Sequence, residues 1–284
     1  MKLEGRREST NVEDRRMSGG TVAGIGIGGL LIAGLIYLLT GQAIDPSQLN
    51  LPSTQTQTTE VEFTQEEQEL ASFSKKILAS TEDVWTAYFQ KNGLGQYTPP
   101  TMVLYTGTTS SGCGTGSASM GPFYCSADQC LYIDLSFFSS MRQQLGADGD
   151  FAYAYVIAHE VGHHVENLLG VLGSAHQQMA RMNSTESNKM SVRLELFADF
   201  LAGVWANNDN SKYKSLEEGD IQEAIQCAQV IGDNYLQKKS QGYVVEESFT
   251  HGTSKQRMNW LAKGLATGDI NQGLPIFKLN YSQL

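Results

Sequence analysis

The sequence predicts an α+β protein of 284 residues that is mostly helical, contains a small β-sheet and is preceded by one transmembrane helix. Three observations support this fold class: an uncharged apolar run near the start of the chain, two short segments of alternating apolar residues, and helical patterns that dominate after them. A few strands followed by packed helices are typical of α+β proteins. The formal net charge of −10, without any basic stripe, argues against nucleic acid as a partner.

Residues 21–40 read TVAGIGIGGLLIAGLIYLLT and contain no charged residue. About twenty apolar residues in a helix span the roughly 30 Å of a bilayer core, so we expect a transmembrane helix here. The basic residues before it, with none after it until Lys75, place the N-terminus in the cytoplasm and the bulk of the chain outside the cytoplasmic membrane, in the periplasm or the extracellular space. The alternative is a cleaved signal peptide, whose apolar core is usually shorter. Gly24 and Gly28 form GxxxG, a candidate seam for a transmembrane-helix dimer.

The next segment, residues 41–60, reads GQAIDPSQLNLPSTQTQTTE and offers little that a core could bury. Its Gln, Thr, Ser and Pro content indicates a flexible linker. The sequence therefore predicts a cytoplasmic tail (residues 1–20), a transmembrane helix (21–40), this linker (41–60) and a folded domain (61–284).

Periodicity predicts the elements of the domain in order. Residues 65–90 favour one amphipathic helix, or two short ones separated near Ser80. Alternating apolar residues predict strands at 102–106 and 130–135, and the Gly and Ser residues of 107–121 indicate a loop between them. Helical patterns then cover residues 137–145, 151–172, 192–207, 220–238 and 254–267.

Three of the five histidines fall in the stretch AHEVGHH, residues 158–164. His159 and His163 are four apart, so on a helix they face the same way and can both reach one zinc ion. Glu160 would lie beside the ion, where it can take a proton from the water that zinc activates. The alternative, a solvated polar face, is disfavoured because the flanking residues are apolar and unpaired His and Glu would be costly there. The motif in this context predicts a Zn²⁺ site.

A catalytic zinc site needs a third protein ligand, and the stretch ELFAD at residues 195–199 offers one. Glu195 and Asp199 are four apart on one face of an otherwise apolar helix, so they need a cation or hydrogen-bond donors nearby. We expect Glu195 to be the third ligand. We expect Asp199 to accept the far N–H of His159 and so fix the orientation of that ring.

Other charged residues provide alternatives to this assignment. Either carboxylate could instead pair with Arg193 or Arg181. Glu186 and Glu166 are weaker ligand candidates, and Glu166 is expected on a different face of the helix that carries the histidines.

Two further residues are candidates to stabilise an oxyanion, namely His251 and Arg257 in the stretch FTHGTSKQR. His251 could equally make a cap or loop contact before the helix that follows. His164 lies about 100° around its helix from the His159–His163 pair, so a structural role is expected for it.

Several motifs together resemble one known family, the putative neutral zinc metallopeptidases, which are bacterial proteins with an N-terminal membrane helix. The resemblance covers nearly the whole chain, and it rests on the stretches RRESTNVEDRR (6–16), GPFYC (121–125), LYIDLSFF (131–138), GDFAYAYVIAHEVGHHVENLLG (149–170), VRLELFADFLAGVW (192–205) and SFTHGTSKQR (248–257). It implies a zincin-like fold and a zinc-dependent peptidase, but no particular substrate.

The same resemblance bears on the four cysteines. Cys113 and Cys125 match the family, whereas Cys130 and Cys227 look like additions. The resemblance therefore implies a Cys113–Cys125 disulfide, with Cys130–Cys227 as a candidate second bridge. The alternative is four reduced thiols, expected if the domain faces the cytoplasm.

These features predict a membrane-anchored zinc endopeptidase that hydrolyses peptide or protein substrates outside the cytoplasmic membrane, with Glu160 as general base. An edge strand at residues 102–106 is the expected place for an extended substrate. The alternative function is a catalytically silent zinc module that serves as a scaffold or interaction domain. Retention of Glu160 favours the enzyme, because a purely structural zinc site has no need of a base.

Overall fold

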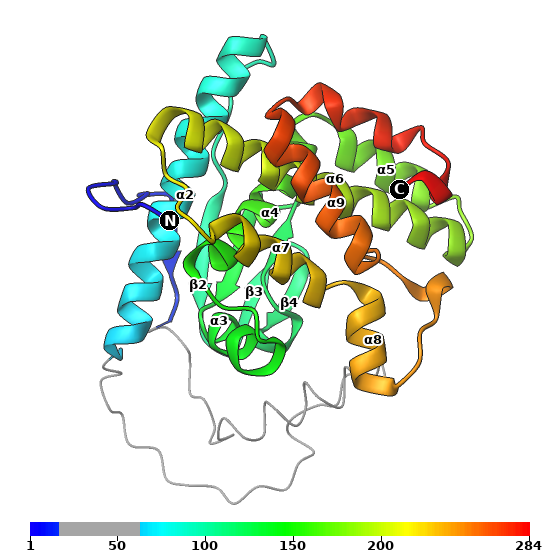
Figure 1. Cartoon of the computed structure of the whole chain (residues 1–284), viewed down its shortest axis with the longest axis horizontal. Coiled ribbons are helices and arrows are strands. Elements are labelled where there is room, and N and C mark those ends of the chain that lie inside the picture. Colours follow the sequence, from blue (N-terminus) through cyan, green and yellow to red (C-terminus); the bar gives the residue numbers. More distant parts are fainter. Residues whose placement is uncertain (17–62) are drawn as a thin grey trace, which may run out of the picture.

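The computed structural model describes residues 1–16 and 63–284 (Figure 1). The predicted transmembrane helix, its GxxxG seam and the linker at 41–60 lie outside these residues. Within the two described ranges, the structure contains no helix with the length and apolarity needed to cross a bilayer. The predicted α+β class is confirmed, because a small sheet is surrounded by a larger set of helices.

A four-stranded sheet occupies the middle of the molecule, in the order β1-β2-β6-β5. Its strands are β1 (Val12–Asp14), β2 (Thr101–Tyr105), β6 (Cys130–Asp134) and β5 (Phe123–Cys125). β1, β2 and β6 run parallel, and β5 is antiparallel to β6. The predicted strands at 102–106 and 130–135 are thus the two central ones, buried by helices on their faces.

The first strand corrects the predicted domain boundary. β1 pairs with β2 in the register Val12↔Met102 to Asp14↔Leu104, so residues 1–16 belong to the folded unit. A domain confined to residues 61–284, with residues 1–20 as a separate tail, is therefore wrong. Three residues of β1 with a mostly polar sequence gave no strand signal, and the apolar run that follows them suggested a boundary.

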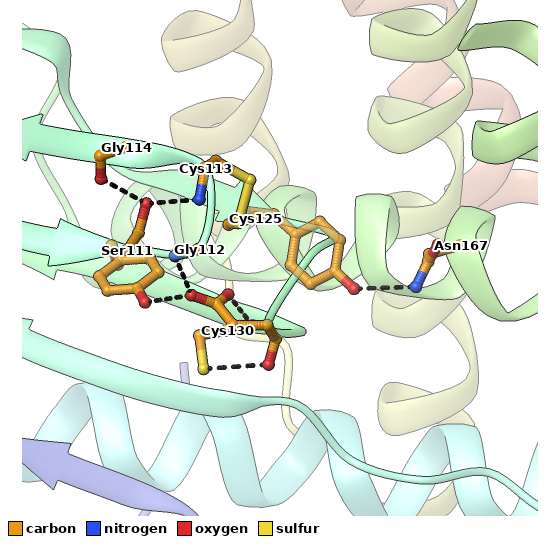
Figure 2. The surroundings of a disulfide bond; sticks show 10 residues. Ser111, Gly112, Cys113, Gly114, Cys125, Cys130 and Asn167 are labelled. Atoms are coloured by element: carbon orange, nitrogen blue, oxygen red, sulfur yellow. Dashed lines mark hydrogen bonds between the residues drawn. A yellow bond between two sulfur atoms is a disulfide. The ribbon is translucent and has the colours of Figure 1, made fainter. Parts of the chain in front are cut away.

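The Gly- and Ser-rich stretch predicted as a loop contains a hairpin, β3 (Thr108–Ser111) with β4 (Gly114–Ser117). A disulfide between Cys113 and Cys125 ties the turn of this hairpin to β5 (Figure 2), which confirms that predicted bridge. The second candidate bridge is wrong, because Cys130 and Cys227 are both free. Cys227 is buried and its thiol lies 3.6 Å from the sulfur of Met141, so it serves as a core side chain.

Helices form the rest of the molecule. They are α2 (Gln65–Asn92), α3 (Ser136–Ser140), α4 (Asp150–Leu168), α5 (Val171–Met179), α6 (Ser184–Tyr213), α7 (Asp220–Val230), α8 (Asp233–Gln241) and α9 (Ser254–Thr267). A π-helical turn (Met141–Leu145) follows α3, and short 3₁₀ turns are Ala118–Met120, Glu246–Ser248, Ile270–Gln272, Leu274–Phe277 and Tyr281–Gln283. Helix α2 runs along one side of the molecule, with the N-terminal residues beside it (Figure 1).

Local sequence explains where these helices begin and end. α2 is one uninterrupted helix, started by a capping box of Thr64 with Glu67 and stopped by Gly93 in the left-handed region. The pattern at 151–172 splits into α4 and α5 because Gly170 takes a left-handed φ of 74°. The pattern at 220–238 splits at Gly232, whose Cα lies against the backbone of Ser254.

Helix α4 is the centre of the core. Of residues 151–166, all but His163 are buried, and α2, α6 and α7 pack around it. The α4–α6 contact is close at Gly162, where a Cβ would come within 2.9 Å of the carbonyl oxygen of Ala198. Gly162, between His159 and His163, therefore allows α4 to approach α6, the helix that carries Glu195 and Asp199.

Candidate metal centre

The candidate metal centre lies where α4 faces α6. The side chains of His159 and His163, from consecutive turns of α4, have their ring centroids 4.8 Å apart. One carboxylate oxygen of Glu195 on α6 lies 3.1 Å from His159 Nε2, and the other lies 3.6 Å from His163 Nε2. One ligand atom from each residue falls within 4.8 Å of the other two. The structure thus brings the three predicted ligands together.

Both imidazole rings are held through their other nitrogen. His159 Nδ1 lies 2.8 Å from the carboxylate of Asp199, as expected from the sequence. His163 Nδ1 lies 2.9 Å from the carboxylate of Glu166. With each Nδ1 engaged, the two Nε2 atoms remain directed at Glu195, and two imidazoles with one carboxylate are a donor set that suits a catalytic zinc ion.

Asp199 is the most constrained carboxylate of the site. Its side chain is fully buried, and both oxygens accept hydrogen bonds of 2.8 Å from the guanidinium of Arg257 on α9. The hydroxyl of Tyr155, one turn before His159, donates a further bond of 2.5 Å. The expected alternative, pairing with Arg193 or Arg181, is wrong, because Arg193 donates to the carbonyls of Ile276 and Leu279 and Arg181 is exposed.

Glu166 corrects a second expectation. It was expected on a different face from the histidines, yet it is fully buried and bonds to His163. Seven residues are nearly two full helical turns, so Glu166 lies almost directly above His159 on the helix surface, next to His163. Its other carboxylate oxygen is buried and has no hydrogen-bond partner in residues 1–16 or 63–284.

The predicted general base lies beside this group of ligands. Glu160 is 7% exposed, and within residues 1–16 and 63–284 its carboxylate has no recorded hydrogen bond or ion pair. A carboxylate that is not consumed by a structural contact is available to accept a proton.

The two oxyanion candidates have different surroundings. The side chain of Arg257 is 4% exposed and is occupied by Asp199, so its assignment as an oxyanion donor is wrong. His251 is half-exposed, and Asp233 lies 3.3 Å from its Nδ1. Burial lowers the pKa of His251, but the carboxylates of Glu195 and Asp233 outweigh burial and raise it. His251 therefore remains a candidate donor near the ligand carboxylate.

His164 has the structural role expected from its position. Its Nδ1 meets the hydroxyl of Tyr124 at 2.9 Å, and its Nε2 meets the carbonyl of Thr98 at 2.7 Å. Since Tyr124 also accepts a bond from Asn167, these contacts attach strand β5 to the second half of α4. Figure 2 shows the bond that Asn167 donates.

Electrostatics favour a cation in the centre. Burial opposes the charged form of both histidines, but Asp199 raises the pKa of His159 to about 9, and Glu195 and Glu166 raise the pKa of His163 well above its usual value. Burial would also raise the pKa of Glu195, but the neighbouring imidazoles lower it. In the absence of a metal ion, these shifts favour protonated imidazoles between the carboxylates. A bound divalent cation would supply positive charge at the same place.

A second group of carboxylates, Asp150, Asp220 and Glu223, also has ligand atoms close together. The amino group of Met1 lies 2.6 Å from Asp150 and 3.2 Å from Asp220. A cation of the chain itself thus lies against two of these three carboxylates.

The roles of three residues of the site were not predicted from the sequence. These are Tyr155, Glu166 and, as the partner of Asp199, Arg257. The first two had a detectable signal, because Tyr155, His159, His163 and Glu166 follow helical spacing along one stripe of α4. Arg257 had none, since it meets Asp199 across a separation of 58 residues through the packing of α9 on α6.

Comparisons with known proteins identify the family of the chain. The family described as "Putative neutral zinc metallopeptidase" matches residues 1–274. An uncharacterized protein of Escherichia coli K12, YpfJ, is 47% identical over 282 residues, covering 96% of this chain and 97% of that protein. The uncharacterized protein Rv2575 of Mycobacterium tuberculosis H37Rv is 41% identical over 202 residues, 68% of this chain and 66% of that protein. No solved structure matches. With its histidine and glutamate triad in place, the chain belongs to the putative neutral zinc metallopeptidase family.

Proposed function

We propose that the protein is a zinc-dependent peptidase with a zincin-like fold, in which His159, His163 and Glu195 hold the ion. The observation that carries this proposal is the convergence of two imidazole Nε2 atoms and one carboxylate, with both Nδ1 atoms already bonded to Asp199 and Glu166. Three protein ligands leave a fourth position open, which is typical of catalytic rather than structural zinc.

A zinc ion held there would polarise a substrate carbonyl and lower the pKa of a water molecule toward neutrality. The chain supplies the remaining chemistry. Glu160, which has no hydrogen bond or ion pair with the described residues, accepts the proton of the attacking water and delivers it to the leaving amine. We assign to His251, which interacts electrostatically with the ligand Glu195, the hydrogen bond to the developing oxyanion, and the burial of the ligand residues strengthens these interactions.

The position of the substrate needs a correction to the sequence-based expectation. β2 was expected to be an edge strand, but it pairs with β1 on one side and β6 on the other. The edge strand nearest the centre is β5, which packs against α4 and is attached to it through Tyr124. We propose that an extended peptide adds to β5 by main-chain hydrogen bonds. A peptide-bound structure with the ligand on another element would refute this placement.

The alternative is a catalytically silent zinc module. Glu160 discriminates between the two functions. A structural site gains nothing from a buried carboxylate that has no hydrogen bond or ion pair within residues 1–16 and 63–284, because desolvating such a group costs free energy. The free carboxylate favours the peptidase.

Substitution Glu160→Gln tests the proposal. The change keeps the shape of the side chain but removes the base, so peptide hydrolysis should fall by about 10²–10⁴-fold while zinc stays bound. The readout is a comparison of newly formed peptide termini in cells carrying the wild-type or the Glu160→Gln chain, with zinc content measured on both purified proteins. Undiminished proteolysis by the variant would exclude Glu160 as the base, and the absence of any cleavage by the wild type would favour the silent module.

A further inference from the structure

The N-terminal residues are built into the same folded unit as the candidate metal centre. β1 adds in parallel to β2, and backbone hydrogen bonds continue on both sides of it: Met102 N–H donates to Asn11 O at 2.9 Å, and Arg15 N–H donates to Leu104 O at 2.7 Å. Further along, Lys2 N–H donates to Ser215 O at 2.7 Å. Residues 1–16 therefore contact the sheet and also the end of α6.

Two buried carboxylates of the domain depend on this segment. Glu82 of α2 is 5% exposed, and within the described part of the chain its side-chain hydrogen bonds come from residues 1–16. Arg7, Ser9 and Asn11 donate to it at 2.8, 2.6 and 2.7 Å. Without these donors a carboxylate would be left buried and unpaired in the middle of α2.

Asp209, near the end of α6, repeats the pattern. It is fully buried, and the cation that pairs with it is Arg6, at 2.9 Å. Ser80 donates the other hydrogen bond to the same oxygen. Among residues 1–16 and 63–284, the cations that pair with these two acidic groups, Arg7 and Arg6, both come from the N-terminal segment.

The chain also leaves and re-enters the folded unit at one place. Arg16, the last described residue before the gap, has its guanidinium 4.2 Å from the ring centroid of Phe63, the first residue after it. The same guanidinium donates to the carbonyl of Glu67 in the first turn of α2. Both ends of the segment 17–62 are therefore fixed beside each other.

We infer from these contacts that residues 1–16 and 63–284 lie on the same side of the membrane. A single crossing by residues 21–40 would place them on opposite sides and remove β1 from the sheet. A second crossing by the polar residues 41–60 is excluded, because the hydrocarbon core offers no partners for their backbone and side-chain groups. This inference goes beyond the proposed peptidase function and does not depend on it. It replaces the expected arrangement of a cytoplasmic tail with an external domain.

Cysteine accessibility in the full-length chain tests the inference. Thr10→Cys and Lys238→Cys each place one thiol at an exposed position, in a Cys130→Ala background, while the buried Cys227 serves as an internal negative control. Spheroplasts that carry each variant are treated with a membrane-impermeant maleimide before or after lysis. The inference predicts the same outcome for both positions, either labelling before lysis or labelling only after it. Labelling of one position before lysis and of the other only afterwards would overturn it.

Crosslinking provides a second readout in the membrane fraction. Ser72 donates a hydrogen bond of 2.5 Å to Glu8, so Glu8→Cys with Ser72→Cys should be joined by a short bismaleimide. A protease site inserted within residues 41–60 then separates the two parts of the chain on a denaturing gel unless they are crosslinked. One band is expected for this pair, and two bands for the matched pair Thr10→Cys with Lys238→Cys, because α8 lies away from the N-terminal residues (Figure 1). Two bands for the first pair would contradict the inference.

Discussion

The two carboxylates behind the histidines hold them in different ways. Asp199 receives hydrogen bonds from Tyr155 and Arg257 in addition to His159, so three helices converge on it and both of its oxygens are satisfied. Glu166 is equally buried, but among the described residues it bonds only to His163 on its own helix, and its second oxygen has no hydrogen-bond partner there. The first contact is part of the tertiary structure, and the second is local to α4.

This difference shows that one metal site can combine two kinds of support. His159 is oriented by a network that also joins α4, α6 and α9, so a change in it should affect folding and metal binding together. His163 is oriented by an i, i+3 contact within one helix, so a change there should leave folding largely intact. The pKa values follow the same division: Asp199 is stabilised as an anion by Arg257, whereas burial raises the pKa of Glu166 to about 7.

The largest expected effect comes from Arg257→Met. It leaves Asp199 buried without its cation, which should lower the free energy of unfolding by about 3–5 kcal/mol. Denaturant unfolding of the metal-free proteins measures this. The control is the double variant Asp199→Asn with Arg257→Met, which removes both charges and should recover part of the loss. A single variant as stable as the wild type would show that the network does not support the fold.

An intermediate effect is expected on zinc affinity. Asp199→Asn should weaken zinc binding by about 10–100-fold, because the orientation and basicity of His159 depend on that carboxylate. Glu166→Gln keeps an acceptor for His163 Nδ1 and should cost less than about tenfold. Competition with a zinc chelator measures both variants under the same conditions. Equal losses of zinc affinity in the two variants would show that Asp199 and Glu166 support their histidines to the same extent.

The smallest effect is a difference in pH dependence. Burial raises the pKa of Glu166 from 4.5 to about 7, so the folded state holds this proton more tightly than the unfolded state. The resulting stability is fully present below pH 4.5 and is lost as the pH rises through 7. For Asp199, burial opposes ionisation but Arg257 lowers the pKa, so its contribution is present above its usual value of 3.8 and is lost in acid.

Unfolding of the metal-free protein between pH 4.5 and 8 should therefore show the wild type losing stability relative to Glu166→Gln as the pH rises. If the stability of the wild type instead increased relative to Glu166→Gln as the pH rises, Glu166 would be held as an anion, like Asp199.

Local spacing explains how much of the site was predictable. His159, His163, Glu195 and Asp199 were found because two i, i+4 pairs of polar residues stand in apolar helices, and helical geometry alone gives each pair a shared face. Arg257 was assigned the wrong role because its contact depends on how α9 packs on α6. That packing requires the close approach of Gly264, where a Cβ would lie 2.0 Å from the carbonyl oxygen of Phe200.

The same limit applies to the fold. Helix α9 was predicted with its observed bounds, since a capping box of Thr253 with Gln256 starts it and Gly268 ends it. β1 was missed because a three-residue strand is specified by its partners on β2 and α2, and none of these is adjacent in sequence. The apolar run at residues 21–40 indicated instead that the folded domain begins after it, whereas residues 1–16 also belong to the folded unit.

The metal content of purified protein tests the central claim most directly. The account predicts about one zinc ion per wild-type chain and a strong loss of zinc in Glu195→Gln, because that change removes the anionic ligand. Glu186→Gln is the matched control, since Glu186 is an exposed carboxylate in the first turn of the same helix and should leave the metal content unchanged. A wild-type protein without zinc, or a Glu195→Gln variant that retains the wild-type amount, would contradict the account.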